Sequence, residues 1–230
     1  MKTNFKVIAF DADDTLWVNE TFFRETEKKF CALLSDFSTS DETMEVLFAT
    51  EMQNLEEYGY GTKGFVLSMI ETALRITGNK VPQHTLEQII ELGKKQINQP
   101  VELLDGVIET LGYLKEKGYK LIVATKGDLL DQERKLQKSK LEKYFHHVEV
   151  MSNKNTADYK KLIKHLEIKP EEFLMIGNSY KSDIEPVLEL GGFGIHIPFH
   201  ITWIHEKTKE VEEHPNWIKL KSIKEVCKLF

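Results

Sequence analysis

Five short apolar runs alternate with helix-like segments along most of this chain, and this alternation constrains the fold more than any other feature. The runs cover residues 7–10, 121–124, 148–151, 173–176 and 194–197. Helical patterns lie between them at residues 106–117, 128–143, 156–166 and 182–190. Short buried strands that alternate with helices form βαβ units, in which the strands run parallel. The sequence therefore predicts an α/β fold with a mostly parallel sheet.

A helical block interrupts this alternation after the first apolar run. Residues 18–97 contain four helix-like segments and no strand-like run, and Pro100 closes the block. Inside it, Thr39 and Glu42 have the spacing of a capping box, which marks the start of a helix. We therefore expect two domains. Residues 1–17 and 98–230 form a Rossmann-like core with helices on both faces of the sheet, and residues 18–97 form an all-helical cap domain.

The composition of the 230 residues, 41% hydrophobic and 30% charged, is that of an ordinary globular protein. A net charge of −6 without a basic stripe argues against a nucleic-acid partner, and residues 133–143 are expected to form a solvated helix face. No run approaches the roughly 20 apolar residues of a membrane span, and the first is too short for a signal peptide. We expect a soluble cytoplasmic protein in which Cys31 and Cys227 are free thiols; its oligomeric state stays open.

Polar and charged residues directly follow four of the five apolar runs. These segments are residues 11–15, 125–127, 152–154 and 177–183. Ligands of open α/β sheets bind beyond the carboxyl ends of the strands. A single segment of this kind could be an ordinary turn, because Asp, Asn and Gly are common in turns. Four of them at the same end of one sheet favour a functional site.

Asp11 and Asp13 stand two residues apart, so both side chains leave on one face if the chain is still extended there. Neighbouring carboxylates raise the pKa of one of them unless a cation intervenes. The pair is therefore interpreted as a Mg²⁺ site or as an acid/base pair, and an Asp-rich turn is the structural alternative.

The balance of charges favours the metal site. Asp11, Asp13 and Asp183 are acidic, and a bound phosphate monoester would add about two negative charges. Lys126 and Lys154 return only two positive charges. A divalent cation would bring this balance near neutrality, and Mg²⁺ prefers oxygen ligands of this kind.

The first two of these segments resemble motifs of the haloacid dehalogenase superfamily, in its phosphatase branch with a helical cap after the first motif. Asp11, Asp13 and Thr15 form a DxDxT sequence that is similar to the first motif. Thr125 resembles the Ser or Thr of the second motif. The resemblance covers roughly the full length of the chain.

The other two segments resemble the third and fourth motifs of the same superfamily. Lys154 lies 23 residues before Gly177, about where the lysine of the third motif falls. Gly177, Asn178, Ser179 and Asp183 are similar to the fourth motif, GDSxxxD. The order and spacing of the four matches together are more specific than any single one.

This resemblance implies a magnesium-dependent phosphatase of small phosphate monoesters. Asp11 would attack phosphorus and form an aspartyl-phosphate, and Asp13 would protonate the leaving oxygen and later activate water. Thr125 and Lys154 would bind the phosphoryl group, and Lys154 would also orient Asp11. The expected Mg²⁺ ligands are the Asp11 carboxylate, the Asp13 carbonyl, Asp183 and, through water, Asn178.

Two residues depart from the family pattern. Asn178 stands where Asp is usual, and Lys126 stands where Asn is common, so the site is expected to be two charges more positive. This difference predicts weaker Mg²⁺ binding and tighter binding of anions, with Lys126 as a further phosphate ligand. The alternative is that Lys126 points to solvent. Asn178 could still orient a metal-bound water through its amide oxygen.

Three alternatives stay open at this point. A phosphomutase would need an aspartyl-phosphate that outlives the exchange of substrates. A haloacid dehalogenase is disfavoured by Asp13, because a halide leaving group needs no proton. A receiver-type regulatory module, which accepts a phosphoryl group, is disfavoured by the helical block.

For some segments the sequence does not indicate a single function. Residues 58–65, which contain Lys63, form either a substrate-facing loop or a helix–helix turn with buried aromatic side chains, and we favour the turn. Trp17 is expected to be a packing residue, and residues 199–218 have no predicted role.

Overall fold

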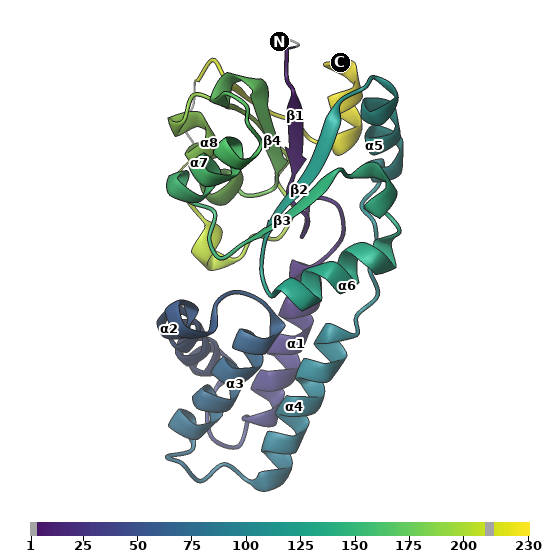
Figure 1. Ribbon diagram of the computed structural model, residues 1–230. Coiled ribbons are helices and arrows are strands. Elements are labelled where there is room, and N and C mark those ends of the chain that lie inside the picture. The colour runs from purple at the N-terminus through teal and green to yellow at the C-terminus, as the bar shows by residue number, and fades with distance from the viewer. Residues whose placement is uncertain (1–3, 210–213) are drawn as a thin grey trace. The chain divides into compact units, whose positions relative to one another are not determined.

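The computed structural model describes residues 4–209 and 214–230, and they form two compact units (Figure 1). The α/β unit takes in the described residues of Met1–Glu20, Val101–Lys126 and Glu133–Phe230. The helical unit contains Thr21–Pro100 together with the short segment Gly127–Gln132. That short segment lies among residues that the sequence analysis placed in the core domain.

The α/β unit is built on a six-stranded sheet in which all five strand pairings are parallel. The strands are β1 (Val7–Phe10), β2 (Lys120–Lys126), β3 (His147–Met151), β4 (Phe173–Gly177), β5 (Phe193–His196) and β6 (Trp217–Lys219). Their order in the sheet is β3-β2-β1-β4-β5-β6. The direction of winding reverses at β1, and the crevice at such a switch point is where open α/β sheets bind ligands.

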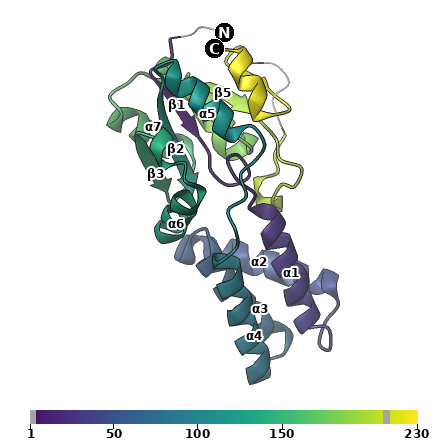
Figure 2. The same cartoon turned by 90° about the vertical axis from the view of Figure 1, so that its right-hand side faces the viewer.

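Alternate residues of β1 pack against opposite layers of helices. The helices are α5 (Val107–Glu116), α6 (Leu129–Ser139), α7 (Thr156–His165) and α8 (Glu185–Glu189). Ile8 and Phe10 belong to the core cluster that includes α5 and the C-terminal 3-10 segment, whereas Val7 and Ala9 belong to the cluster of α7 and α8. Figures 1 and 2 show α5 beside the yellow C-terminal segment. This arrangement confirms the predicted α/β fold with helices on both faces.

The helical unit has a core of its own. Its helices are α1 (Glu20–Leu33, whose first residue lies in the α/β unit), α2 (Ser40–Tyr58), α3 (Thr62–Ile76) and α4 (Gln83–Ile97). Phe30, Leu47 and Ile89 are fully buried in it. The predicted capping box opens α2, because Thr39 Oγ1 accepts from the Glu42 amide (3.3 Å) and the Glu42 carboxylate accepts from the Thr39 amide (3.1 Å).

Residues 59–61 form the turn between α2 and α3 that was predicted within residues 58–65. Phe65 is buried, but Tyr58 is 41% exposed, so the expectation that the aromatic side chains pack inside holds only in part. Lys63 forms an ion pair with Asp128 at 3.0 Å. Asp128 lies in the segment Gly127–Gln132, and this contact helps to hold that segment in the helical unit.

Two elements differ from the expectation from the sequence, β6 and the π-helical turn before α8. β6 has three residues, of which the first two lie within the stretch 199–218, and a strand this short shows no detectable alternation. Residues 210–213 of that stretch lie outside the described residues. The predicted helix 182–190 begins as a π-helical turn, Tyr180–Ile184, before α8. Both cysteines are free, as expected. No helix among the described residues is long and apolar enough to cross a membrane.

Candidate active site

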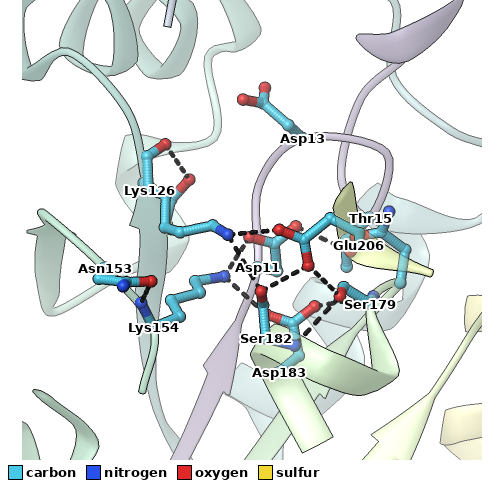
Figure 3. A network of polar contacts seen from close by, with 12 residues as sticks. Asp11, Asp13, Thr15, Lys126, Asn153, Lys154, Ser179, Ser182, Asp183 and Glu206 are labelled. Atoms are coloured by element: carbon cyan, nitrogen blue, oxygen red, sulfur yellow. Dashed lines mark hydrogen bonds and ion pairs between the residues drawn. The ribbon is translucent and has the colours of Figure 1, made fainter. Parts of the chain in front are cut away.

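The carboxyl ends of four neighbouring strands, β3, β2, β1 and β4, bring the predicted residues together. Asp11 directly follows β1, Lys126 ends β2, Lys154 follows β3, and Asp183 follows β4 by one irregular turn. Figure 3 shows the side chains of these residues converging from the four strand ends. The parallel register makes this possible, because Phe10 lies opposite Val123 and Ile176 in the two neighbouring strands.

Lys154 lies between two carboxylates at the centre of the group. Its Nζ forms ion pairs with Asp11 Oδ1 and, at 2.7 Å, with Asp183 Oδ1. Burial by itself would lower the pKa of Lys154, but the two carboxylates outweigh burial and hold that pKa above its usual value. Burial raises the pKa of Asp11 to about 7 against the opposing effect of Lys154. One ammonium is therefore shared by two carboxylates, and its single positive charge balances only one of their two negative charges.

Asp183 reaches the site because the chain after β4 turns tightly. Its Oδ2 accepts from the Ser179 amide at 3.0 Å, and its side chain is 1% exposed. A Cβ on Gly177 would lie 2.1 Å from Asp183 Oδ2 and 2.3 Å from its Cγ. Glycine is therefore the residue that leaves room for Asp183 at the end of β4.

Thr15 and Asn178 contact Asp11 Oδ2, the carboxylate oxygen that Lys154 does not bind. Thr15 Oγ1 lies 3.2 Å from Asp11 Oδ2. The Asn178 amide nitrogen can donate to Asp11 Oδ2, the Asp13 carbonyl oxygen and Thr15 Oγ1, each at 3.2 Å. This orientation of the amide supplies donors to the three neighbouring oxygens. The role expected for Asn178, orienting a metal-bound water through its amide oxygen, stays a prediction.

The oxygens around Asp11 suit a hard cation. Asp11 Oδ2 and the Asp13 carbonyl oxygen both lie 3.2 Å from the Asn178 amide nitrogen. Burial raises the pKa of Asp11, and a bound cation would lower that pKa again because it stabilises the carboxylate. Mg²⁺ is commonly held by one or two carboxylates and keeps several waters. In residues 4–209 and 214–230, no three His, Cys, Asp or Glu side chains form a metal site. The Asp11 and Asp13 oxygens are nevertheless of the type that Mg²⁺ binds, and water would complete its coordination.

The Asp13 carboxylate has partners different from those of Asp11. It accepts from Trp17 Nε1 at 2.7 Å and from Lys135 Nζ at 3.0 and 3.2 Å, and Lys135 also binds Asn19. Figure 3 shows it apart from the carboxylates of Asp11 and Asp183. Trp17 is buried, as expected for a packing residue, but it is also a donor. Lys135 belongs to the stretch that was expected to be a solvated helix face, yet its side chain is only 20% exposed.

Asp14 shapes the turn that follows the first motif. It has a positive φ of 61°, and its carboxylate accepts from the amides of Asn19 and Glu20 at 2.8–3.1 Å. Burial raises its pKa to about 7, because these hydrogen bonds offset the loss of water only in part. Asp14 thus fixes the start of α1, a role that its position between Asp13 and Thr15 did not indicate.

Thr125 and Lys126 end β2 with different contacts. Thr125 is buried, and its hydroxyl donates to the Lys126 carbonyl at 3.3 Å. The Lys126 ammonium donates to Glu206 Oε1 at 2.6 Å and to Ser182 Oγ at 3.0 Å. The side chain of Lys126 is therefore directed into the α/β unit and is charge-compensated there.

Glu206 is the functional candidate that the sequence analysis missed. Its Oε2 accepts from Ser179 Oγ at 2.6 Å and from Ser182 Oγ at 2.5 Å. Burial would raise the pKa of Glu206, but Lys126 and the two hydroxyls outweigh burial and lower that pKa to about 2. The expected excess of two positive charges is thus reduced by one. Glu206 lies in the 3-10 turn Ile204–Glu206, in a stretch with no helix or strand pattern that could have marked it.

Comparisons with known proteins agree with this arrangement. The sequence profile of the haloacid dehalogenase-like hydrolases matches residues 5–191. The chain belongs to this family. A haloacid dehalogenase-like hydrolase of Xanthomonas campestris has a similar crystal structure, with a TM-score of 0.88 and 34% identity over 98% of this chain and 90% of that one.

Two relatives of this hydrolase have named activities. A glyceraldehyde 3-phosphate phosphatase of Pyrococcus furiosus is 27% identical over 199 residues, which cover 81% of this chain and 78% of the relative. The pyrophosphatase PpaX of Bacillus cereus is 30% identical over 124 residues, which cover 50% of this chain and 57% of the relative. The chain is therefore similar to hydrolases whose names describe two different phosphate substrates.

Proposed function

We propose that this hydrolase is a magnesium-dependent phosphatase that acts on small phosphate monoesters through an aspartyl-phosphate. The observation that carries the proposal is the buried group in which Lys154 bridges Asp11 and Asp183 at the strand ends. Such a group combines a carboxylate nucleophile with a cation for the phosphoryl oxygens. The names of the Pyrococcus furiosus and Bacillus cereus relatives support phosphate as the group removed.

In the first step, an oxygen of Asp11 attacks phosphorus and the ester P–O bond breaks. Asp13 gives its proton to the departing alkoxide oxygen, so that an alcohol leaves. Lys154 holds Asp11 in place and balances charge on the phosphoryl oxygens, and the Thr125 hydroxyl donates to one of them. In the second step, Asp13 takes a proton from water, the water oxygen attacks phosphorus, and phosphate leaves with Asp11 restored.

Mg²⁺ would be held by the Asp11 carboxylate, the Asp13 carbonyl and Asp183, with Asn178 beside it. When bound, it would supply positive charge that offsets the phosphate dianion and the surrounding acids. A further positive charge would be favourable there, because Asp11 is buried and shares the Lys154 ammonium with Asp183. Before Asp13 can act as acid and base, its carboxylate must break its contacts with Lys135 and Trp17 and contact the substrate or water.

The helical unit would act as a cap that excludes water and selects the substrate. It has its own buried core, so it can keep its shape while substrates enter and leave. Lys63 is paired with Asp128 inside this unit, which argues against Lys63 as a free anion ligand.

The test measures p-nitrophenyl phosphate hydrolysis with and without a chelator, in the unchanged protein and in Asp11→Asn. Turnover that needs metal and disappears in the variant supports the phosphatase. Halide release from a haloacid without metal would favour a dehalogenase. Transfer of phosphate to a second hydroxyl without release to water would favour a phosphomutase. The receiver-type module is set aside, because the chain belongs to a hydrolase family.

A further inference from the structure

The α/β unit holds a buried carboxylate that the proposed reaction does not use. Glu206 comes from the 3-10 turn Ile204–Glu206 and lies among Lys126, Ser179 and Ser182, as Figure 3 shows. The side chains of Glu206 and Lys126 are only 12% and 14% exposed. A carboxylate at this depth is retained only with close partners, because burial penalises an unpaired charge strongly.

The partners of Glu206 are the kind of groups that bind a phosphate. Its two oxygens accept from one ammonium and two hydroxyls, at 2.6 Å from Lys126, 2.6 Å from Ser179 and 2.5 Å from Ser182. A phosphoryl group offers the same chemistry, namely charged oxygens that accept from Lys and Ser. The Lys126 ammonium donates to Ser182 Oγ at 3.0 Å, and the next residue, Asp183, binds Lys154. The ammonium therefore lies near the group that an incoming phosphate would meet.

We propose that Glu206 is an internal counter-anion that competes with phosphate for Lys126 and thereby keeps the site from holding inorganic phosphate tightly. The inference rests on the proposed function, because it concerns how that site binds its product. Lys126 adds a positive charge to a site that already contains Lys154, and an unpaired lysine there would retain the phosphate dianion. Glu206 supplies the opposite charge at 2.6 Å. Phosphate must displace Glu206 to reach Lys126, and the carboxylate returns when phosphate leaves.

A merely structural role makes a different prediction. Glu206 also ties the segment around residues 204–206 to the turn after β4, through Ser179 and Ser182. If it served only as this tie, its neutralisation would loosen the segment without strengthening phosphate binding. Competition requires tighter binding, and it requires Lys126 for that effect.

The experiment measures the dissociation constant of inorganic phosphate by calorimetry, with Mg²⁺ present and ionic strength held constant. Glu206→Gln should bind phosphate at least about 10-fold more tightly, because a negative charge close to the dianion is removed. The inhibition of p-nitrophenyl phosphate hydrolysis by phosphate should strengthen by the same factor. The double variant Lys126→Gln with Glu206→Gln should bind phosphate within about 3-fold of the unchanged protein, since both charges are removed together.

Two further variants separate charge from position. Glu206→Asp keeps the carboxylate, so its phosphate affinity should stay within about 3-fold of the unchanged protein. Glu142→Gln makes the same change of charge at an exposed residue of another 3-10 turn and should have no effect. Circular dichroism and urea unfolding confirm that each variant is folded before binding is measured.

The results distinguish this inference from the proposed function. Equal or weaker phosphate binding in a folded Glu206→Gln overturns the inference, even if the unchanged protein hydrolyses p-nitrophenyl phosphate. Tighter binding that persists in the double variant also overturns it, because Lys126 would then play no part. If no variant binds phosphate and none hydrolyses the ester, the proposed function fails, and the inference fails with it.

Discussion

Gly177 shows how a single residue can determine whether the site forms. It ends β4, and a Cβ there would lie 2.1–2.6 Å from three atoms of the Asp183 side chain. Asp183 cannot move away freely, because its two oxygens are bound by Lys154 and by the Ser179 amide. The smallest side chain is therefore needed at this position for reasons of space.

We expect Gly177→Ala to lower the free energy of unfolding by about 1–3 kcal/mol, the usual cost of an overpacked buried site. It should also abolish hydrolysis, because Asp183 is displaced. Urea denaturation and an activity assay measure the two effects. Gly112→Ala is the matched control: it lies within α5 with nothing near its Cβ, and it should stabilise the protein by about 0.5–1 kcal/mol. Equal effects of the two changes would contradict the steric argument.

The lowered pKa of Glu206 predicts that the stability of the folded protein depends on pH. Its partners lower its pKa to about 2, below the ordinary value of 4.5. This contribution is fully present above pH 4.5 and is lost as the pH falls towards 2, because the unfolded chain then binds the proton first. The contribution lost by pH 3 is about 2 kcal/mol.

Urea denaturation at pH 6 and pH 3 measures this loss. Glu206→Gln should lose less stability over this interval than the unchanged protein, by about 2 kcal/mol. Glu142→Gln should behave like the unchanged protein, since its carboxylate is exposed on a different turn. Parallel losses in all three proteins would show that Glu206 is not the titrating group.

Helix α2 illustrates an element whose start is set by two side chains. The capping box of Thr39 and Glu42 supplies partners to amides that have none within the helix. The hydrophobic face of α2 is sparse, with Leu47 its buried aliphatic residue, so the cap is a relatively large share of what holds its first turn.

Thr39→Ala should destabilise the helical unit by about 1 kcal/mol, because the amide of Glu42 loses its acceptor. Thr39→Ser keeps the hydroxyl and should cost only a small part of that. Hydrogen exchange of the amides in the first turn of α2 measures the local effect. Unchanged exchange in Thr39→Ala would mean that the box contributes nothing to the helix.

Among the helices and strands, the sequence predicts best those with a regular pattern of apolar residues. β1 begins and ends at the predicted residues, and the apolar runs of β2 and β4 lie within the strands. The parallel strands then place Asp11, Lys154 and Asp183 together, as their positions after those runs predict.

Glu206 and Lys135 could not be predicted in this way. Glu206 lies in irregular chain, and its contacts depend on how residues 199–209 return over the strand ends. Lys135 is one of two lysines on α6, and nothing in the local pattern tells which of them binds Asp13. The spatial arrangement of distant segments determines both contacts.

For the whole molecule, Mg²⁺ should stabilise one unit more than the other. The proposed ligands all lie in the α/β unit, and a ligand stabilises the part that binds it by mass action. At a Mg²⁺ concentration about 100 times the dissociation constant, the gain is about 2.7 kcal/mol. Where the two units unfold separately, only the transition of the α/β unit should move to higher temperature.

Differential scanning calorimetry with Mg²⁺ and with a chelator tests this expectation. Asp183→Asn should remove most of the shift, whereas Asp105→Asn, at an exposed aspartate of the same unit, should retain it. A shift of the same size in both variants would place the ion elsewhere.

The central position of β1 also affects the order in which the chain can fold. Val7 pairs with Lys120, 113 residues later, and with Phe173, 166 residues later. During synthesis β1 thus emerges long before either neighbour exists, while the helices after it make mostly local contacts and can form early. Such distant pairings slow folding and leave an apolar strand exposed in the meantime. We expect newly made chains to depend on chaperones until β4 has been translated.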